Sequence, residues 1–146
     1  MVMKYPVMLT AGMALWFAGL SGCERMAGRS ITVEFRNAEG LRGGEAVYVA
    51  GVRVGTAGKP ELSAGHAIVP VTLSRQHKDA VPAGTVFLLK HDPQDSSRFA
   101  LAGAVCSESP PGQQPPRSYR GARNRLEFVG MCGAAKAAEI FEELTR

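Results

Sequence analysis

The stretch VEFRNAEGLRGGEAVYVAGVRVG, residues 33–55, decides the fold. It continues a run that starts at Ile31, in which apolar and polar side chains alternate as they do in a half-buried strand. Two further short runs, 46–50 and 52–54, are rich in β-branched residues and meet at Gly51, where a glycine permits a sharp corner or a bulge. The stretch therefore predicts three short strands in close succession.

Two other glycines in this stretch are predicted to shape the backbone. Gly40 can adopt a positive φ that Leu41 would resist, so that Leu41 can turn under the end of a barrel. Gly55 allows another part of the backbone to approach closely. We interpret these residues as structural rather than chemical.

Short apolar runs with turn signals between them continue along the chain, which favours an all-β barrel or sandwich. Pro70 interrupts one of these runs, so we expect its strand to be an edge strand or to be bulged. The remaining expected strands are 66–73, 85–90, 99–105 and 126–129.

A short helix is expected at the C-terminus, over 134–144. Its apolar residues share one face and must pack against another surface, since a helix of this length is marginal alone. That surface is either its own barrel or a neighbouring subunit. The residues on this face are Ala137, Ile140, Phe141 and Leu144.

Composition agrees with one globular domain. The chain has 146 residues, of which 45% are hydrophobic and 21% charged, and its mean hydropathy is -0.04. These values exclude a wholly disordered chain and a multi-span membrane protein. The formal net charge of +4 is too small to indicate nucleic-acid binding.

The N-terminus has the features of an export signal. Lys4 precedes an uncharged, mostly apolar run over 5–20, which is shorter than a membrane-spanning helix requires. The sequence Leu-Ser-Gly-Cys that ends at Cys23 resembles the lipobox of bacterial lipoproteins. That resemblance implies a lipoprotein signal peptide over 1–22, acylation of Cys23, and a tether over 23–30. An ordinary secretory signal with an incidental cysteine is the alternative.

By the same resemblance, the anchored chain would lie on the periplasmic side of a bacterial membrane. Glu24 follows the cysteine, where lipoproteins kept at the inner membrane often carry aspartate. The outer membrane is therefore favoured over the inner one. Two cysteines remain in the mature chain, Cys106 and Cys132, and an oxidising compartment favours a disulfide between them over two free thiols.

The segment 107–125 is rich in proline and arginine, and we interpret it as an exposed insertion between two strands. Its arginines form either a solvated loop or a contact with anionic lipid head groups, and Tyr119 could lie at such an interface. These arginines are Arg117, Arg120, Arg123 and Arg125.

The first half of the chain resembles the mammalian-cell-entry (MCE) domain of the MlaD-like bacterial lipid-transport family. The resemblance covers 31–89, and its specific part is the strand, the Gly-Leu turn and the pattern A-G-V-x-V-G within the stretch quoted above. The family-motif residues are Gly40, Leu41, Gly51, Val52, Val54 and Gly55. The resemblance implies a small MCE-type β-barrel over 31–130, with the proline- and arginine-rich insertion 107–125 inside it. The C-terminal helix follows within 131–146.

The resemblance also implies a function. Family members assemble into homo- or hetero-hexameric rings beside an ABC permease and ATPase and pass lipid between two membranes. An apolar loop lines the ring's pore in several members, but the corresponding stretch here, 91–98, is polar. The apolar residues just after it, Phe99 and Leu101, are the candidate lipid contacts. A scaffold lipoprotein that joins the complex without touching lipid is the alternative.

No catalytic motif is present in the sequence, so we expect no enzyme activity, no cofactor, no metal and no nucleic-acid partner. A metal site built from His66, His77 or His91 with Asp92 or Asp95 would be a weak arrangement. A hydrolase set of His91 with Ser96 or Ser97 would rest on nearness in sequence alone.

Overall fold

The computed structural model describes residues 28–145. The expected signal peptide over 1–22, Cys23 and most of the tether therefore lie outside the described residues. Within the described part, no helix is both long and apolar enough to cross a bilayer. The elements are β1 (Ser30–Phe35), β2 (Ala46–Val49), β3 (Val52–Ala57), β4 (Glu61–Ser63), β5 (His66–Leu73), the 3-10 turn η2 (Arg75–His77), β6 (Thr85–His91), β7 (Phe99–Val105), β8 (Ser118–Ala122), α1 (Arg125–Cys132) and α2 (Ala134–Leu144).

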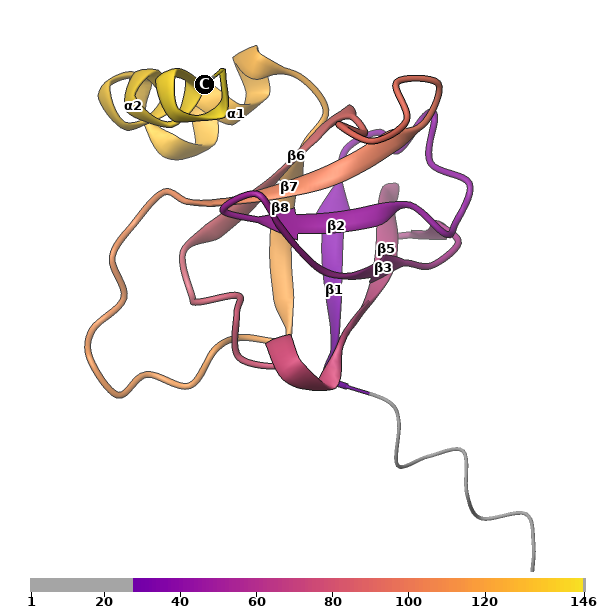
Figure 1. Ribbon diagram of the computed structural model, residues 1–146, viewed down its shortest axis with the longest axis horizontal. Coiled ribbons are helices and arrows are strands. Elements are labelled where there is room, and N and C mark those ends of the chain that lie inside the picture. Colours follow the sequence, from indigo (N-terminus) through magenta and orange to yellow (C-terminus); the bar gives the residue numbers. More distant parts are fainter. Residues whose placement is uncertain (1–27, 146) are drawn as a thin grey trace, which may run out of the picture.

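Seven of the strands close into a small barrel in the order β1-β8-β6-β7-β2-β3-β5, and pairing of β5 with β1 completes the ring (Figure 1). β4 lies outside this ring and pairs with β5 alone. The pairs β1–β8, β6–β8 and β2–β7 are parallel, and the others are antiparallel. The predicted all-β class and small barrel are confirmed.

The barrel is filled by side chains that alternate along its strands, as the pattern in 31–35 predicts. Ile31, Val33 and Phe35 point inward and are at most 2% exposed, whereas the residues between them are half-buried. Strands from every side of the ring add to this core, which includes Val47, Val54, Val69, Val71, Leu73, Phe87, Leu89, Leu101 and Tyr119. Because side chains fill the interior, the barrel is a packed core rather than a channel.

Pro70 does not mark an edge strand. β5 lies between β1 on one side and β3 followed by β4 on the other, so the expectation of an edge is wrong. Pro70 falls where β3 has ended and β4 has not begun, so the ladder loses little by its missing N–H. Its carbonyl still accepts a 2.6 Å hydrogen bond from the Gly58 N–H.

The proline- and arginine-rich segment contains a barrel strand that its composition hides. β8 takes up 118–122 and pairs with β1 and β6, so the segment is not wholly an exposed insertion. Tyr119 is only 4% exposed and belongs to the core. The Arg29 guanidinium donates to the carbonyl oxygens of Pro115 and Pro116, which fixes the approach to the strand.

The strand expected over 126–129 is instead part of α1. Asn124 caps this helix by accepting a 2.9 Å hydrogen bond from the Glu127 N–H, and the Glu127 carboxylate accepts from the N–H of the preceding Arg123 at 2.8 Å. These two bonds at the N-terminus favour a helix start over an extended strand. The helical part therefore begins at Arg125 rather than near residue 131.

α2 spans the predicted 134–144, and its apolar face packs on its own chain. Ala137 and Ile140 are buried beside Phe128 of α1 and the outward face of β6, where Val86 and Leu88 lie. Figure 1 shows both helices at the upper left, beside the barrel. Within the chain, this face therefore packs on α1 and on the outward side of β6, and contact with a neighbouring subunit stays a prediction.

Candidate functional site

The family-motif residues build one end of the barrel and one hairpin. Gly40 has a φ of +99°, and an added Cβ there would lie 2.7 Å from the Phe99 ring. Leu41 follows it and turns inward, leaving 8% of its surface exposed. The Leu41 N–H donates to the Ala38 carbonyl at 3.0 Å, which closes the turn after β1.

The second part of the motif forms the β2–β3 hairpin. Ala50 and Gly51 have φ values of 49° and 77°, the left-handed pair that a two-residue hairpin turn requires. Val54 is buried, whereas Val52 is 52% exposed. An added Cβ at Gly55 would lie 2.3 Å from the Thr72 carbonyl oxygen, so β3 and β5 approach too closely there for any side chain. These are positions that shape the fold.

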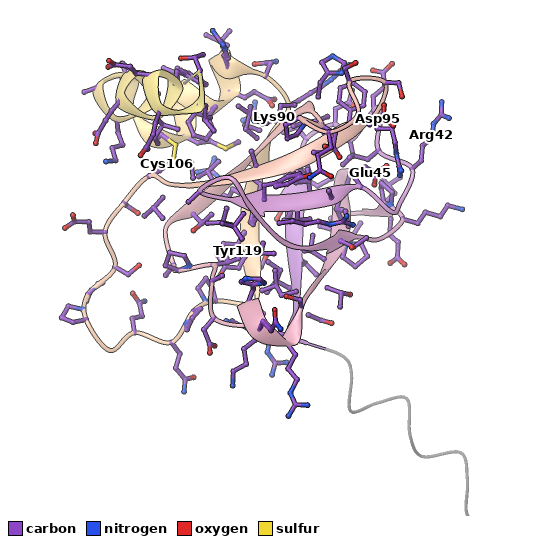
Figure 2. The ribbon with its side chains drawn as sticks, in the orientation of Figure 1. Arg42, Glu45, Lys90, Asp95, Cys106 and Tyr119 are labelled. Atoms are coloured by element: carbon purple, nitrogen blue, oxygen red, sulfur yellow. A yellow bond between two sulfur atoms is a disulfide. The ribbon has the colours of Figure 1, made fainter. Side chains whose placement is uncertain are left out.

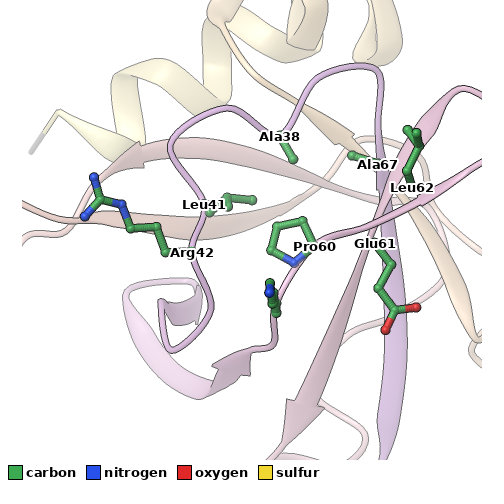
Figure 3. Close-up of a pocket in the computed structure, with 8 residues that line it drawn as sticks. Ala38, Leu41, Arg42, Pro60, Glu61, Leu62 and Ala67 are labelled. Atoms are coloured by element: carbon green, nitrogen blue, oxygen red, sulfur yellow. The ribbon is translucent and has the colours of Figure 1, made fainter.

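The turn after β1 forms one wall of an open groove, and the β4–β5 hairpin forms the other. The volume of this groove is about 510 Å³. Leu41, Ala38 and Pro60 meet in its middle, and the side chains of Arg42 and Glu61 point away on opposite sides (Figure 3). Leu62, at the hairpin, is 83% exposed. We call this surface the Leu62 groove; it is lined by Ala38, Leu41, Arg42, Lys59, Pro60, Glu61, Leu62 and Ala67.

A second hollow of about 390 Å³ shares Arg42 with the Leu62 groove. Its other lining residues are Gly40, Gly43, Glu45, Ser97, Arg98 and Phe99. The Glu45 carboxylate is 5% exposed and accepts hydrogen bonds from the Arg42 N–H at 2.6 Å and from the Gly43 N–H at 2.9 Å. Glu45 therefore holds the shared wall of both hollows in place.

Cations outnumber anions around these two hollows. Arg42, Lys59 and Arg98 line them, against exposed Glu61 and buried Glu45, whose carboxylate is already used by backbone donors. Figure 2 shows Arg42 reaching outward from this side of the molecule. An apolar surface bordered by cations fits a ligand with an apolar part and an anionic part.

The polar loop after β6 is held by hydrogen bonds within itself and to β2. Asp92 accepts from the Tyr48 hydroxyl at 3.2 Å and from the Gln94 N–H at 2.8 Å. Asp95 accepts from the Ser97 hydroxyl at 2.6 Å and from the Ser97 N–H at 3.0 Å, and these bonds lower the pKa of the Asp95 carboxyl. The acidic side chains of this loop are therefore used to stabilise its turns.

The residues considered for chemistry do not assemble into a site. His66 pairs with Glu34, His77 contacts the Ser74 hydroxyl at 2.8 Å, and the His91 ring stacks on Phe99 with 5.0 Å between centroids. Over residues 28–145, no group of three or more histidine, cysteine, aspartate or glutamate side chains could hold a metal ion.

The two candidate lipid contacts differ in placement. Leu101 is fully buried in the barrel core and offers no surface to a ligand. Phe99 is half-buried against that core and lines the second hollow. The apolar run after the polar loop is thus largely used by the fold, because β7 pairs on both sides and turns alternate residues inward.

The four arginines considered together do not form one patch. Arg117 precedes β8 near the start of β1, whereas Arg123 lies beyond the other end of β8 and pairs with Glu39 at 2.8 Å. The Arg125 guanidinium sits 4.8 Å from the centre of the Phe141 ring. Two of the four are therefore occupied within the fold.

Cys106 and Cys132 are joined by a disulfide, with their Cα atoms 4.9 Å apart. It links the residue after β7 to the last residue of α1 and so ties the helices to the barrel. Cys23 lies outside the described residues.

Sequence reasoning missed the Leu62 groove. Lys59 and Pro60 read as a break between strands, and the three residues of β4 are too few to show a period. The available signal was a single leucine, Leu62, close to an Ala-Gly turn. It indicates a groove only when the turn after β1 is known to lie opposite it.

A family model described as "MlaD protein" matches residues 27–101, about half of the chain and most of its barrel. Among solved structures, the chain is similar to a chain of "Acinetobacter MlaFEDB complex in ATP-bound Vtrans1 conformation". The identity is 10% and the TM-score 0.48, over 69% of this chain and 78% of that one. No curated protein matches.

Proposed function

The chain belongs to the MlaD family, and on that basis we propose that it is a membrane-anchored periplasmic subunit of an ABC-type lipid-transport system that binds or guides lipid. The family is one of transport components, so the partners are permease and ATPase chains, and ATP hydrolysis falls to the ATPase. The observation that carries the proposal is the family match over 27–101, which covers the turn after β1, the β2–β3 hairpin and the Leu62 groove.

The Leu62 groove is the proposed lipid-contact surface. Leu62 is 83% exposed, and covering such a side chain with an acyl chain gains about 2 kcal/mol at 25 cal/mol per Å² of apolar surface. Arg42 and Lys59 border the groove and suit an anionic head group. Phe99 extends this surface into the second hollow, whereas Leu101 is buried and cannot contact lipid.

Acylation of Cys23 is the proposed anchor. A lipoprotein carries two or three acyl chains, and about 0.8 kcal/mol per buried CH₂ makes that a stable attachment. Glu24 favours the outer membrane over the inner. Labelling cells with a fatty-acid analogue tests the anchor: the wild type incorporates label and a Cys23→Ser variant does not. Label on neither protein, or equally on both, overturns it.

A homo- or hetero-hexameric ring is the proposed assembly. Native mass spectrometry of the exported Cys23→Ser form tests assembly and cargo together, because this form carries no acyl chains of its own. A mass near six protomers with bound phospholipid supports both proposals. A bare monomer counts against a homo-hexamer and against lipid binding by this chain alone.

The competing function is a scaffold lipoprotein that joins the transport complex without contacting lipid. The polar loop after β6 favours it, since the loop's acidic groups are all engaged in turn hydrogen bonds. Leu62→Ser tests the lipid role, and Val52→Ser is the matched control, since Val52 is an exposed apolar residue on a different hairpin. Lipid co-purification that falls in Leu62→Ser alone supports the groove; equal retention of lipid by both variants refutes it.

A further inference from the structure

One end of the barrel gathers basic side chains from three separate parts of the chain. We call it the basal end: it is where β1 begins, and the structure places η2 and the approach to β8 beside it (Figure 1). The Leu73 N–H donates to the Arg29 carbonyl at 2.9 Å, and the Thr32 N–H donates to the Arg117 carbonyl at 2.8 Å. These bonds bring Arg29, Arg75, Lys78 and Arg117 to the same end.

Three of these four cations are exposed and can meet a partner. The Arg29 guanidinium is engaged by Pro115 and Pro116 and is half-buried. Arg75, Lys78 and Arg117 are exposed. Lys78 lies 3.9 Å from Asp79, an exposed pair that contributes little attraction in water. Among residues 28–145, the acidic side chains of this region are Asp79 and, in the loop before β8, Glu108, so positive charge predominates there.

The short segment before β1 indicates that a membrane surface faces the basal end. Gly28, the first described residue, comes only five positions after Cys23, and five extended residues reach at most about 18 Å. A chain acylated at Cys23 therefore keeps its basal end close to the membrane surface. This step rests on the anchor proposed above.

We propose that the basal end is a membrane-contact face, on which Arg75, Lys78 and Arg117 bind anionic lipid head groups. Positive charge at the basal end is attracted to such a surface, so the orientation with this end facing the membrane is favoured. The turn after β1 and the β4–β5 hairpin then lie away from the anchoring membrane, since β1 runs from the basal end toward them. The Leu62 groove is thereby presented to a second membrane or to a partner rather than to the membrane that holds the anchor.

The first test needs no anchor and uses the exported Cys23→Ser form. Its partition is measured on vesicles of phosphatidylcholine and on vesicles of equal parts phosphatidylcholine and phosphatidylglycerol. Binding is expected on the anionic vesicles and should fall with added salt. Because one basic residue near such a surface is worth about fivefold in partition, Arg75→Gln, Lys78→Gln and Arg117→Gln together should weaken binding about a hundredfold.

A second triple variant carries the same change in charge away from the basal end. Arg36 follows β1, Arg123 follows β8 and Lys136 is on α2. All three are exposed, and their replacement by glutamine should leave partition within about twofold of the unaltered protein. Equal losses in the two triple variants would show a response to net charge and overturn the proposal. Equal binding to both kinds of vesicle would also overturn it.

The second test uses the acylated protein in vesicles and compares two lysines by amine labelling. Lys78 is at the basal end, and Lys136 is on α2. Both are exposed and both lie within 4 Å of an acidic side chain, so they are matched. Anionic lipid should protect Lys78 and leave Lys136 unchanged. Equal protection of both, or of neither, counts against the face even where labelling has confirmed the acyl anchor.

Discussion

The Tyr119 hydroxyl donates a 2.7 Å hydrogen bond to the Val81 carbonyl oxygen across 38 residues of sequence. Both residues are buried, at 4% and 0% exposure. The Tyr119 ring also meets Phe87 edge-on, with 5.9 Å between centroids. This contact joins β8 to the loop before β6 and shows that a strand inside a polar segment is held by the core.

Replacing Tyr119 by phenylalanine should reduce the free energy of unfolding by about 1 kcal/mol, because the Val81 carbonyl is left buried without its donor. Urea denaturation measures the change. Tyr48→Phe is the matched control, since its hydroxyl bonds Asp92 at a longer 3.2 Å. We expect a smaller loss there. A Tyr119→Phe protein as stable as the wild type would contradict the role given to this bond.

Alkaline pH should destabilise the protein through the same tyrosine. Burial raises the pKa of Tyr119, against a smaller opposing effect of Arg29, so the folded state holds this proton more tightly than the unfolded state does. The stabilisation is complete below the ordinary tyrosine pKa of about 10 and is lost as pH rises through and above that value. Burial and the hydrogen bond to Asp92 raise the pKa of Tyr48 in the same direction.

Urea midpoints followed from neutral to strongly alkaline pH measure this effect. The midpoint of the wild type should decline above about pH 10, and the decline should be shallower in Tyr119→Phe. Tyr48 remains in that variant, so part of the decline persists. Parallel curves for the two proteins would show that Tyr119 does not contribute.

Sequence reasoning succeeds here wherever one face of a strand is buried. The alternation in 31–35 predicts β1, and the apolar face of 134–144 predicts α2, because each pattern records which side chains leave water. It fails for β8, a short strand in which Ser118 and Arg120 are exposed while Tyr119 and Gly121 are buried. An added Cβ at Gly121 would lie 2.4 Å from the Phe35 ring, so Tyr119 alone shows an apolar side chain on the inward face, and one residue makes no alternating pattern.

The start of α1 was missed for a different reason. Leu126 and Phe128 read as alternating strand residues, but Leu126 is 82% exposed and only Phe128 of the two is buried. The bonds that Asn124 accepts from the Glu127 N–H and Glu127 accepts from the Arg123 N–H favour the helix there, and their sequence signal is weak beside the apolar pattern. The Leu62 groove depends on two turns far apart in the chain, a relationship that no local pattern carries.

Gly55 should be among the least replaceable glycines of the barrel. Gly55→Ala places a Cβ 2.3 Å from the Thr72 carbonyl oxygen, and backbone cannot move aside as a flexible side chain does. We expect a loss of about 2–3 kcal/mol in the free energy of unfolding. Gly130→Ala is the control, because nothing lies within 4 Å of its added Cβ and the position is helical. That variant should gain about 0.5–1 kcal/mol, and a loss at Gly130 matching that at Gly55 would refute the steric argument.

The disulfide should stabilise the whole domain and, most directly, the attachment of its helices. It closes a sequence separation of 26 residues, for which loop closure in the unfolded chain predicts about 3–4 kcal/mol. A Cys106→Ala, Cys132→Ala protein should unfold at lower urea, and hydrogen exchange should rise first in α1 and α2, which the bond ties to the end of β7. A reductant should shift the wild type toward the double variant and leave the double variant unchanged. If the reductant shifts both proteins equally, the bond is not the source of the stability.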